Sequence, residues 1–274
     1  MKIGLLGAES THAAHFCETV NRLMDTPHLI THLFGDDNHQ MEQELAERYN
    51  LTVCGSAGEL IDAVDAVVIV YRMGSLHYGA AMAAMKAGKP VFVDKPFTTD
   101  LSQAQSLVEY AESHGCLLCG GSNLKQLEGL RPIREAAEGS QVMTVSFAAD
   151  PDSPYEGFWF YGSHSVELCL ELYGEAYTSV SAFTNGSNLI ANIHYPDKLC
   201  VIATSSSVPG LCISLSSISR GKTMIYPVPM QYQQLGPREF LAMLDSGKLP
   251  RKYDFYVTAT RLIHQIMEAA ALNG

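Results

Sequence analysis

The chain has 274 residues, of which 47% are hydrophobic and 17% charged, so it can bury a substantial core and is not intrinsically disordered. Its 18 Lys and Arg residues against 29 Asp and Glu residues leave a net charge of −11. This charge repels a phosphate backbone or an anionic membrane surface, which argues against nucleic-acid or membrane binding as the main activity. At about 150 residues per domain, the length predicts two domains or one large one.

The N-terminus and the cysteines indicate a cytoplasmic protein. Residues 1–10 reach turn residues too soon for a secretory signal and predict a first strand. No stretch approaches the ~20 consecutive apolar residues of a membrane span. Seven cysteines, an odd number spread thinly over the chain, predict reduced and mostly buried thiols. Cys116 and Cys119 lie in one predicted strand, roughly 10 Å apart with opposed side chains, so we expect no disulfide between them.

Up to about residue 120, short apolar runs alternate with helical patterns. The predicted strands cover residues 2–6, 29–34, 66–70, 90–93 and 116–119. The predicted helices cover residues 11–24, 41–49, 57–61, 77–87 and 101–113. The unbroken apolar run at 66–70 is typical of a strand buried on both faces of a parallel sheet. Repeated βαβ units of this length predict a Rossmann-type, doubly wound parallel sheet.

After Gly120 and Gly121 the pattern changes. Helices are predicted at 124–138, near 163–173, at 237–245 and at 255–271, and a strand at 141–149. From residue 177 to about 228 several strands follow one another, with turn signals at 185–186, 196–197, 209–210 and 221, which predicts antiparallel pairing. We therefore expect a dinucleotide-binding domain at residues 1–121. We also expect an α+β domain at 122–274 that forms a homo-oligomer through the free face of an open antiparallel sheet.

Two motifs stand at the ends of predicted elements. The strand at 90–93 runs into Asp94-Lys95-Pro96, and Gly162-x-His164-x-x-Glu167 opens a later helix. They resemble the Glu-Lys-Pro and Asp-x-Gly-x-His-x-x-Asp hallmarks of the Gfo/Idh/MocA family of nicotinamide-dependent sugar and polyol oxidoreductases. The resemblance covers the chain in element order, although the chain is shorter than most members. It implies NAD(P)-dependent oxidation or reduction of a small hydroxy compound, with the domain at 122–274 binding the substrate.

The turn after the first strand is the candidate phosphate-binding turn. In a dinucleotide fold, backbone N–H groups of this turn and the next helix N-terminus meet the pyrophosphate, usually with the spacing G-x-G-x-x-G. Here only Gly7 remains, because Glu9 and His12 occupy the second and third glycine positions. Ser10 and Thr11 partly compensate, since hydroxyls donate to phosphate oxygens or cap the helix. A degenerate fold that binds no nucleotide stays open as the alternative.

An acidic pair follows the second predicted strand. Asp36 is expected to accept hydrogen bonds from the ribose hydroxyls of NAD and to repel the 2′-phosphate of NADP, and Asp37 reinforces the repulsion. No Arg lies between residues 31 and 47 to pair with that phosphate. The sequence therefore favours NAD over NADP, with a solvated turn as the alternative.

Arg72 stands where the resemblance implies a turn that touches the cofactor. Its guanidinium is expected either to reach the pyrophosphate or an anionic substrate group, or to lie on the surface. The cofactor-binding set predicted from the residues and the resemblance is Gly7, Ser10, Thr11, His12, Asp36, Asp37, Arg72, His77, Asp94 and Lys95.

Oxidation of a carbinol needs a group that takes the hydroxyl proton and positive charge where the alkoxide develops. Lys95, at the carboxyl end of a buried strand, is expected to orient the substrate hydroxyl and to stabilise that charge. His164 is the candidate acid/base, because an unperturbed histidine titrates near neutral pH.

The family's acidic partner for this histidine belongs at Phe160, so the resemblance implies that Glu167 or the Tyr161 hydroxyl substitutes for it. Trp159 either stacks on a sugar or packs beside the helix. The predicted catalytic residues are Lys95, His164 and Tyr161. The predicted substrate-binding residues are Lys95, Trp159, Tyr161, His164 and Glu167.

Three functions are compatible with these residues. The leading one is an NAD-dependent oxidoreductase acting on a sugar, polyol or related hydroxy compound. The second is a lyase or hydrolase that oxidises a sugar derivative transiently, and the third is a non-catalytic ligand sensor on the same fold. No catalytic metal is expected, because the histidines lack the ligand spacing of a zinc site.

Overall fold

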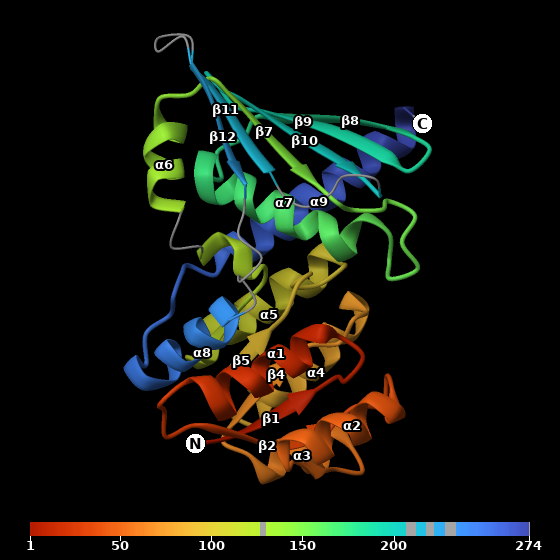
Figure 1. Ribbon diagram of the computed structural model, residues 1–274, viewed down its shortest axis with the longest axis vertical. Coiled ribbons are helices and arrows are strands. Elements are labelled where there is room, and N and C mark those ends of the chain that lie inside the picture. The colour runs from red at the N-terminus through yellow and green to blue at the C-terminus, as the bar shows by residue number, and fades with distance from the viewer. Residues whose placement is uncertain (127–129, 207–211, 218–221, 228–233, 274) are drawn as a thin grey trace. The chain divides into compact units, whose positions relative to one another are not determined.

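The computed structural model describes residues 1–126, 130–206, 212–217, 222–227 and 234–273 (Figure 1). The chain divides into two compact units, one of Met1–Asn123 with Gln233–Asp254 and one of Leu124–Tyr232 with Phe255–Gly274. The division after Asn123 lies close to the boundary expected after residue 121. The segment 233–254, which the sequence assigned to the second domain, belongs to the first unit. The turn signals at 209–210 and 221 and the expected strand end at 228 lie outside the described residues.

The first unit is built on a six-stranded parallel sheet with the order β3-β2-β1-β4-β5-β6. This is the doubly wound order of a Rossmann fold, as the sequence predicted. Its strands are β1 (Lys2–Leu6), β2 (Leu29–Phe34), β3 (Thr52–Val53), β4 (Ala66–Ile69), β5 (Val91–Val93) and β6 (Leu118–Gly120). Its helices are α1 (Thr11–Glu18), α2 (His39–Tyr49), α3 (Ala57–Ala63), α4 (His77–Lys86), α5 (Leu101–His114) and α8 (Leu235–Ser246).

Helices cover both faces of this sheet. Ile3 and Leu5 of β1 belong to a buried cluster that includes Phe16 of α1 and Phe240 of α8. Gly4 faces the opposite side, where a Cβ atom would lie 2.3 Å from Leu60 Cδ2 of α3. Because the strands are parallel, the carboxyl ends of β2, β1, β4 and β5 lie next to one another at one edge, where ligands bind in such folds.

The helix predicted at 11–24 has two parts. The α-helix α1 ends at Glu18 and continues as a π-helical turn, η1 (Thr19–Leu23). The polar residues before several helices act as caps: Asn38, Ser56 and Asp100 accept hydrogen bonds from backbone N–H groups in the first turns of α2, α3 and α5. These caps satisfy N–H groups that have no partner within their helix.

The second unit contains an open sheet with the order β12-β11-β7-β10-β9-β8. Its strands are β7 (Val142–Phe147), β8 (Ser179–Asn185), β9 (Asn188–His194), β10 (Leu199–Ser205), β11 (Cys212–Ser217) and β12 (Lys222–Pro227). The sheet is mixed rather than wholly antiparallel, because β7 and β10 pair in parallel. Helix α7 (Phe158–Tyr173) lies between them in the chain, and such a long connection lets two neighbouring strands run in the same direction.

Helices α7 and α9 (Asp254–Asn273) lie on the same side of this sheet (Figure 1). Along β9 the side chains of Leu189, Ala191 and Ile193 are buried, whereas Ile190 and Asn192 between them are half-buried. This alternation gives the sheet one core face and one open face. Of the helix predicted at 124–138, the described residues contain the 3₁₀ turn η3 (Asn123–Gln126) and helix α6 (Leu130–Glu138), and residues 127–129 lie outside them. None of the helices within the described ranges is long and apolar enough to cross a membrane.

Candidate functional site

The turn after β1 begins with a glycine that the fold itself requires. Gly7 has a φ of +99°, a conformation that side chains rarely adopt. A Cβ atom at this position would lie 2.7 Å from the backbone nitrogen of Tyr71, at the end of β4. The close approach of these two strand ends therefore explains Gly7 without reference to any ligand.

The next two backbone N–H groups of this turn donate to a carboxylate. Asp37, just beyond β2, accepts from the N–H of Ala8 at 2.8 Å through Oδ1 and from the N–H of Glu9 at 3.2 Å through Oδ2. Burial raises the pKa of Asp37, and these two hydrogen bonds oppose the rise. Ser10 caps α1 by accepting from the N–H of His12, and Thr11 is exposed.

The neighbouring carboxylate has a different partner. Asp36 accepts a hydrogen bond from the Tyr71 hydroxyl at 3.1 Å, and burial together with Asp36 raises the pKa of Tyr71 well above its ordinary value. Arg72 lies beside the turn, with Nη1 3.9 Å from Glu9 Oε1. The structure thus places Glu9, Asp36, Asp37 and Arg72 around the first βα turn, and their contact with a cofactor stays a prediction.

A buried histidine–aspartate pair joins α1 to the end of β5. His12 Nδ1 lies 2.6 Å from Asp94 Oδ2, and the two residues are 8% and 1% exposed. Burial alone would raise the pKa of Asp94, but His12, Lys95 and His77 more than offset it and hold the pKa at about 2. Within the part of the chain that the structure describes, the second oxygen, Oδ1, is buried and has no hydrogen-bond partner.

Lys95 follows this pair directly and is only 4% exposed. Burial lowers the pKa of its ammonium to about 8, while Asp94 opposes this shift and Arg72 adds to it. A lysine poised near neutral pH can hold or release a proton, which is the property expected of a group that handles a substrate hydroxyl.

His77 is fully buried, and its two ring nitrogens contact backbone carbonyl oxygens. Nδ1 lies 2.7 Å from the oxygen of Pro96 and Nε2 lies 2.9 Å from that of Tyr71. Burial lowers the pKa of His77 despite these acceptors. These contacts tie the loop after β4 to the loop after β5. The expected contact between His77 and a cofactor stays a prediction.

In the second unit, the candidate acid/base lies on α7 among aromatic rings. His164 is fully buried, with its ring centroid 5.3 Å from that of Phe147 and 6.2 Å from that of Tyr161. Tyr161 is 37% exposed. Phe160, where the resemblance implied an acid, packs against Tyr155 and Tyr161.

Glu167, one turn further along α7, forms a buried ion pair. Its Oε2 lies 3.0 Å from Lys125 Nζ, and the two side chains are 3% and 0% exposed. Arg134 of α6 forms an ion pair with Glu171, which like Glu167 lies on α7. These pairs fix α7 against η3 and α6, so Glu167 has a structural partner that the sequence analysis did not anticipate. Substrate binding by Glu167 and by the half-buried Trp159 stays a prediction.

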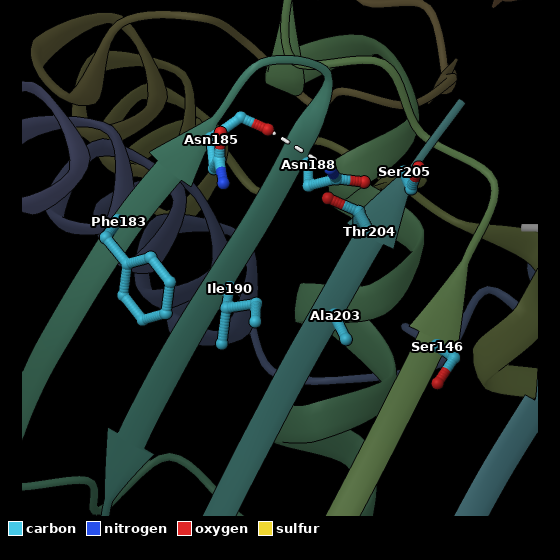
Figure 2. A pocket seen from close by; sticks show the side chains of 8 residues that line it. All are labelled: Ser146, Phe183, Asn185, Asn188, Ile190, Ala203, Thr204 and Ser205. Carbon is cyan, nitrogen blue, oxygen red and sulfur yellow. Dashed lines mark hydrogen bonds between the residues drawn. The ribbon is translucent and has the colours of Figure 1, made fainter. Parts of the chain in front are cut away.

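A shallow hollow of about 390 Å³ lies on the open face of the second sheet, near the β8–β9 turn. Figure 2 shows its lining from four strands, with Asn188 donating to the Asn185 carbonyl oxygen at 3.1 Å. Ile190, Ala203 and Ser146 on this face are half-buried, whereas their chain neighbours on the core face are buried. In the described ranges, no three His, Cys, Asp or Glu side chains are grouped to hold a metal ion.

The sequence found the residues at the strand ends but not their partners. The His12–Asp94 pair, the Asp37 bonds to the turn and the Lys125–Glu167 pair were not predicted. A signal existed for the first of these, since a histidine in place of a glycine on a buried turn needs a polar partner.

This fold defines an α/β protein of the dinucleotide-binding class, with charged and hydrogen-bonding groups at the carboxyl edge of its parallel sheet. Residues 1–122 match the family model described as an oxidoreductase family with an NAD-binding Rossmann fold, the Gfo/Idh/MocA family. The matched residues contain the Asp94-Lys95-Pro96 motif, whereas the Gly162-x-His164-x-x-Glu167 motif lies outside them.

Individual proteins are also similar to this chain in sequence or in structure. The uncharacterised oxidoreductase YhhX of Escherichia coli is 26% identical over 73% of this chain and 63% of its own length. The UDP-N-acetylglucosamine 3-dehydrogenase of Acidithiobacillus ferrooxidans is 31% identical over 40% of this chain and 36% of its own. Both matches thus span less than two thirds of these relatives. The crystal structure of GenD2 from gentamicin A biosynthesis, in complex with NAD, has a TM-score of 0.85 at 18% identity over 99% of this chain and 94% of that one. That likeness establishes the fold.

The acid after β2 and the N-terminus of α1 are suited to a bound dinucleotide, but the hydrogen bonds from the turn to Asp37 conflict with one. Asp36 lies just after β2, the position at which an acid binds the ribose in such folds, and the N-terminus of α1 follows the turn, where an anion would be favoured. The N–H groups of Ala8 and Glu9, however, already donate to Asp37. A dinucleotide fits this turn once the Asp37 side chain has moved off these two groups.

Proposed function

We propose that this protein is an NAD-dependent oxidoreductase that transfers a hydride between nicotinamide and a sugar, polyol or related small hydroxy compound. The observation that carries the proposal is Lys95, buried at the carboxyl end of β5 with a pKa lowered to about 8, in a unit that matches an NAD-binding Rossmann family. The sugar-nucleotide relative supports a carbohydrate substrate.

In the first unit, we propose that Lys95 and Asp94 bind the substrate. Lys95 orients the substrate hydroxyl and stabilises negative charge on its oxygen. The free oxygen of Asp94 accepts from a second hydroxyl of the substrate. When bound, the nicotinamide accepts or gives the hydride.

For residues of the second unit we propose roles that are consistent with their contacts within that unit. His164 acts as acid/base, and Tyr161 supports it through its partly exposed hydroxyl. Trp159 stacks on the apolar face of the substrate. Glu167 acts through its ion pair with Lys125, which holds α7 and so positions His164.

We propose NAD rather than NADP as the cofactor. Asp36 and Asp37 place two carboxylates just after β2, where the 2′-phosphate of NADP would be repelled. Seven cysteines, all free, support a reducing compartment and hence a cytoplasmic protein. The open face of the second sheet, with its shallow hollow (Figure 2), supports a homo-oligomer formed through that sheet.

The single Trp159 provides a test by fluorescence. NADH is expected to quench it saturably and at lower concentration than NADPH. Incubation with NAD⁺ and a panel of sugars and polyols should then produce NADH, measured by absorbance, and Lys95→Met should slow this production by about 100-fold while quenching persists. Absence of saturable NADH binding, measured also by calorimetry, would overturn the proposal.

The Asp37 bonds to the turn favour one competing function, a ligand sensor without catalysis. A sensor would bind a sugar in calorimetry with an affinity that NAD⁺ leaves unchanged, and no compound of the panel would yield NADH. The proposed enzyme requires the opposite result in both measurements.

A further inference from the structure

The carboxylate of Asp37 occupies the first βα turn in the way an anionic ligand would. Both of its oxygens are used, one by the N–H of Ala8 at 2.8 Å and the other by the N–H of Glu9 at 3.2 Å. Hydrogen bonds from backbone N–H groups to a charged oxygen are among the strong ones in proteins. The turn of a dinucleotide fold normally offers such groups to a diphosphate.

Asp37 has no other structural task in the described part of the chain that accounts for its position. The N-cap of α2 is Asn38, whose side chain accepts from the N–H of Met41. The bond from Tyr71 goes to Asp36 rather than to Asp37. Two adjacent acids thus have separate roles, one at the strand end and one inside the turn.

The negative charge around the turn prevents a diphosphate from binding the turn while the Asp37 carboxylate is there. Asp36 already places a further negative charge near Asp37, and Arg72, a cation beside the turn, lies 3.9 Å from the Glu9 carboxylate. A diphosphate that approached the same N–H groups would meet the Asp37 carboxylate at contact distance, and like charges in a partly buried site repel strongly.

We propose that Asp37 is an internal anion that holds the phosphate-binding turn and must be displaced by the diphosphate of the cofactor, so that this residue sets the cofactor affinity. The proposal rests on the proposed function for the identity of the cofactor. When the competent state is only a fraction of the population, the measured affinity falls by that fraction. A turn that is open about one tenth of the time would bind about tenfold more weakly than the same turn without the carboxylate.

The neighbouring acid provides a matched control of the same size and charge. Asp37→Asn removes the competing charge and one of the two acceptors, so it should bind NAD⁺ about tenfold more tightly than the wild type in calorimetry. Asp36→Asn removes the negative charge and one of the two acceptor oxygens that would bind the ribose, and it should bind NAD⁺ more weakly. In the absence of ligand, Asp37→Asn should also lower the Tm by about 3 °C, because the turn loses an internal bond. A residue with a purely structural role would lower the Tm without tightening the binding.

A second probe separates this inference from the proposed function. Inorganic pyrophosphate should raise the Tm of Asp37→Ala, whose turn is free, but not that of the wild type or of Asp36→Asn. If no variant binds NAD⁺ but pyrophosphate protects Asp37→Ala alone, the proposed function fails and the inference stands. If the wild type binds NAD⁺ and Asp37→Asn binds it equally or more weakly, the proposed function stands and the inference is overturned. Pyrophosphate protection that is equal in all three proteins also overturns the inference.

Discussion

Replacing His12 by leucine should destabilise the first unit by about 2 kcal/mol near neutral pH. The change removes the imidazole that lies 2.6 Å from Asp94 and leaves the buried carboxylate without its main partner. A fall in the pKa of Asp94 from 3.8 to about 2 corresponds to about 2 kcal/mol, at about 1.4 kcal/mol for each pH unit. His12 is the largest contributor to that fall, so most of this stabilisation should be lost.

The pH dependence follows from the sign of the shift. The folded-state pKa of Asp94 is lower than the unfolded one, so its contribution is fully present above about pH 5. As the pH falls below 3.8, the unfolded chain takes up the proton first, and the contribution disappears as the pH approaches about 2. The difference in unfolding free energy between His12→Leu and the wild type should therefore be constant from pH 7 to 5 and shrink below pH 4.

Urea unfolding monitored by circular dichroism measures this difference. His15→Leu is the control, because His15 lies on the same helix with its ring 5.9 Å from His12 and is not bonded to Asp94. Its pKa is lowered by burial, so this substitution should cost little. A double-mutant cycle with Asp94→Asn should give a coupling of about 2 kcal/mol. A His12→Leu protein as stable as the wild type at pH 7, or a difference that persists unchanged toward pH 2, would refute the reasoning.

Three further predictions concern other parts of the chain. Lys95→Met should lower kcat by about 100-fold, and in the wild type kcat should decline as the pH rises through about 8, where Lys95 loses its charge; a pH–rate profile that stays level up to pH 10 would contradict this. Lys125→Met should cost about 3 kcal/mol in urea unfolding because the Glu167 carboxylate stays buried, and adding Glu167→Gln should recover part of the loss. Gly7→Ala should lower the unfolding free energy by about 2 kcal/mol, because its Cβ would lie 2.7 Å from the Tyr71 nitrogen at a φ of +99°; a Tm equal to that of the wild type would be inconsistent with this packing.

The elements that the sequence predicted best are those with a strong local signal. The strands Lys2–Leu6 and Leu29–Phe34 have the predicted bounds, because each is a short, mostly apolar segment followed directly by a glycine, Gly7 or Gly35. The two-residue strand β3 (Thr52–Val53) is too short to carry a period and was missed. Helix α7 begins at Phe158 rather than near residue 163, since its aromatic first turn does not show helical spacing of apolar and polar residues.

Pairing over long distances along the chain explains what the sequence could not show. The parallel pair β7–β10 depends on how the chain returns after α7. The bonds from Asp37 to the turn join residues 28 and 29 positions apart, and the Lys125–Glu167 pair joins residues 42 positions apart. Spacing within one element predicts which side chains share a face, but contacts between elements depend on the tertiary fold.

The departures from the family pattern nevertheless compensate each other in pairs. His12 replaces a glycine of the turn and Asp94 replaces the glutamate of the Glu-Lys-Pro motif, and these two residues meet at 2.6 Å although they lie 82 positions apart. Glu9 replaces another glycine and lies 3.9 Å from Arg72, which stands in a turn that also differs from the family. Because a new charge in a buried site is costly without a partner, one unusual residue of this kind predicts a second. A chain with His12 but a glutamate at position 94, whose longer side chain would crowd the imidazole, is therefore expected to be less stable than this one, and the variant Asp94→Glu tests this in the same urea assay.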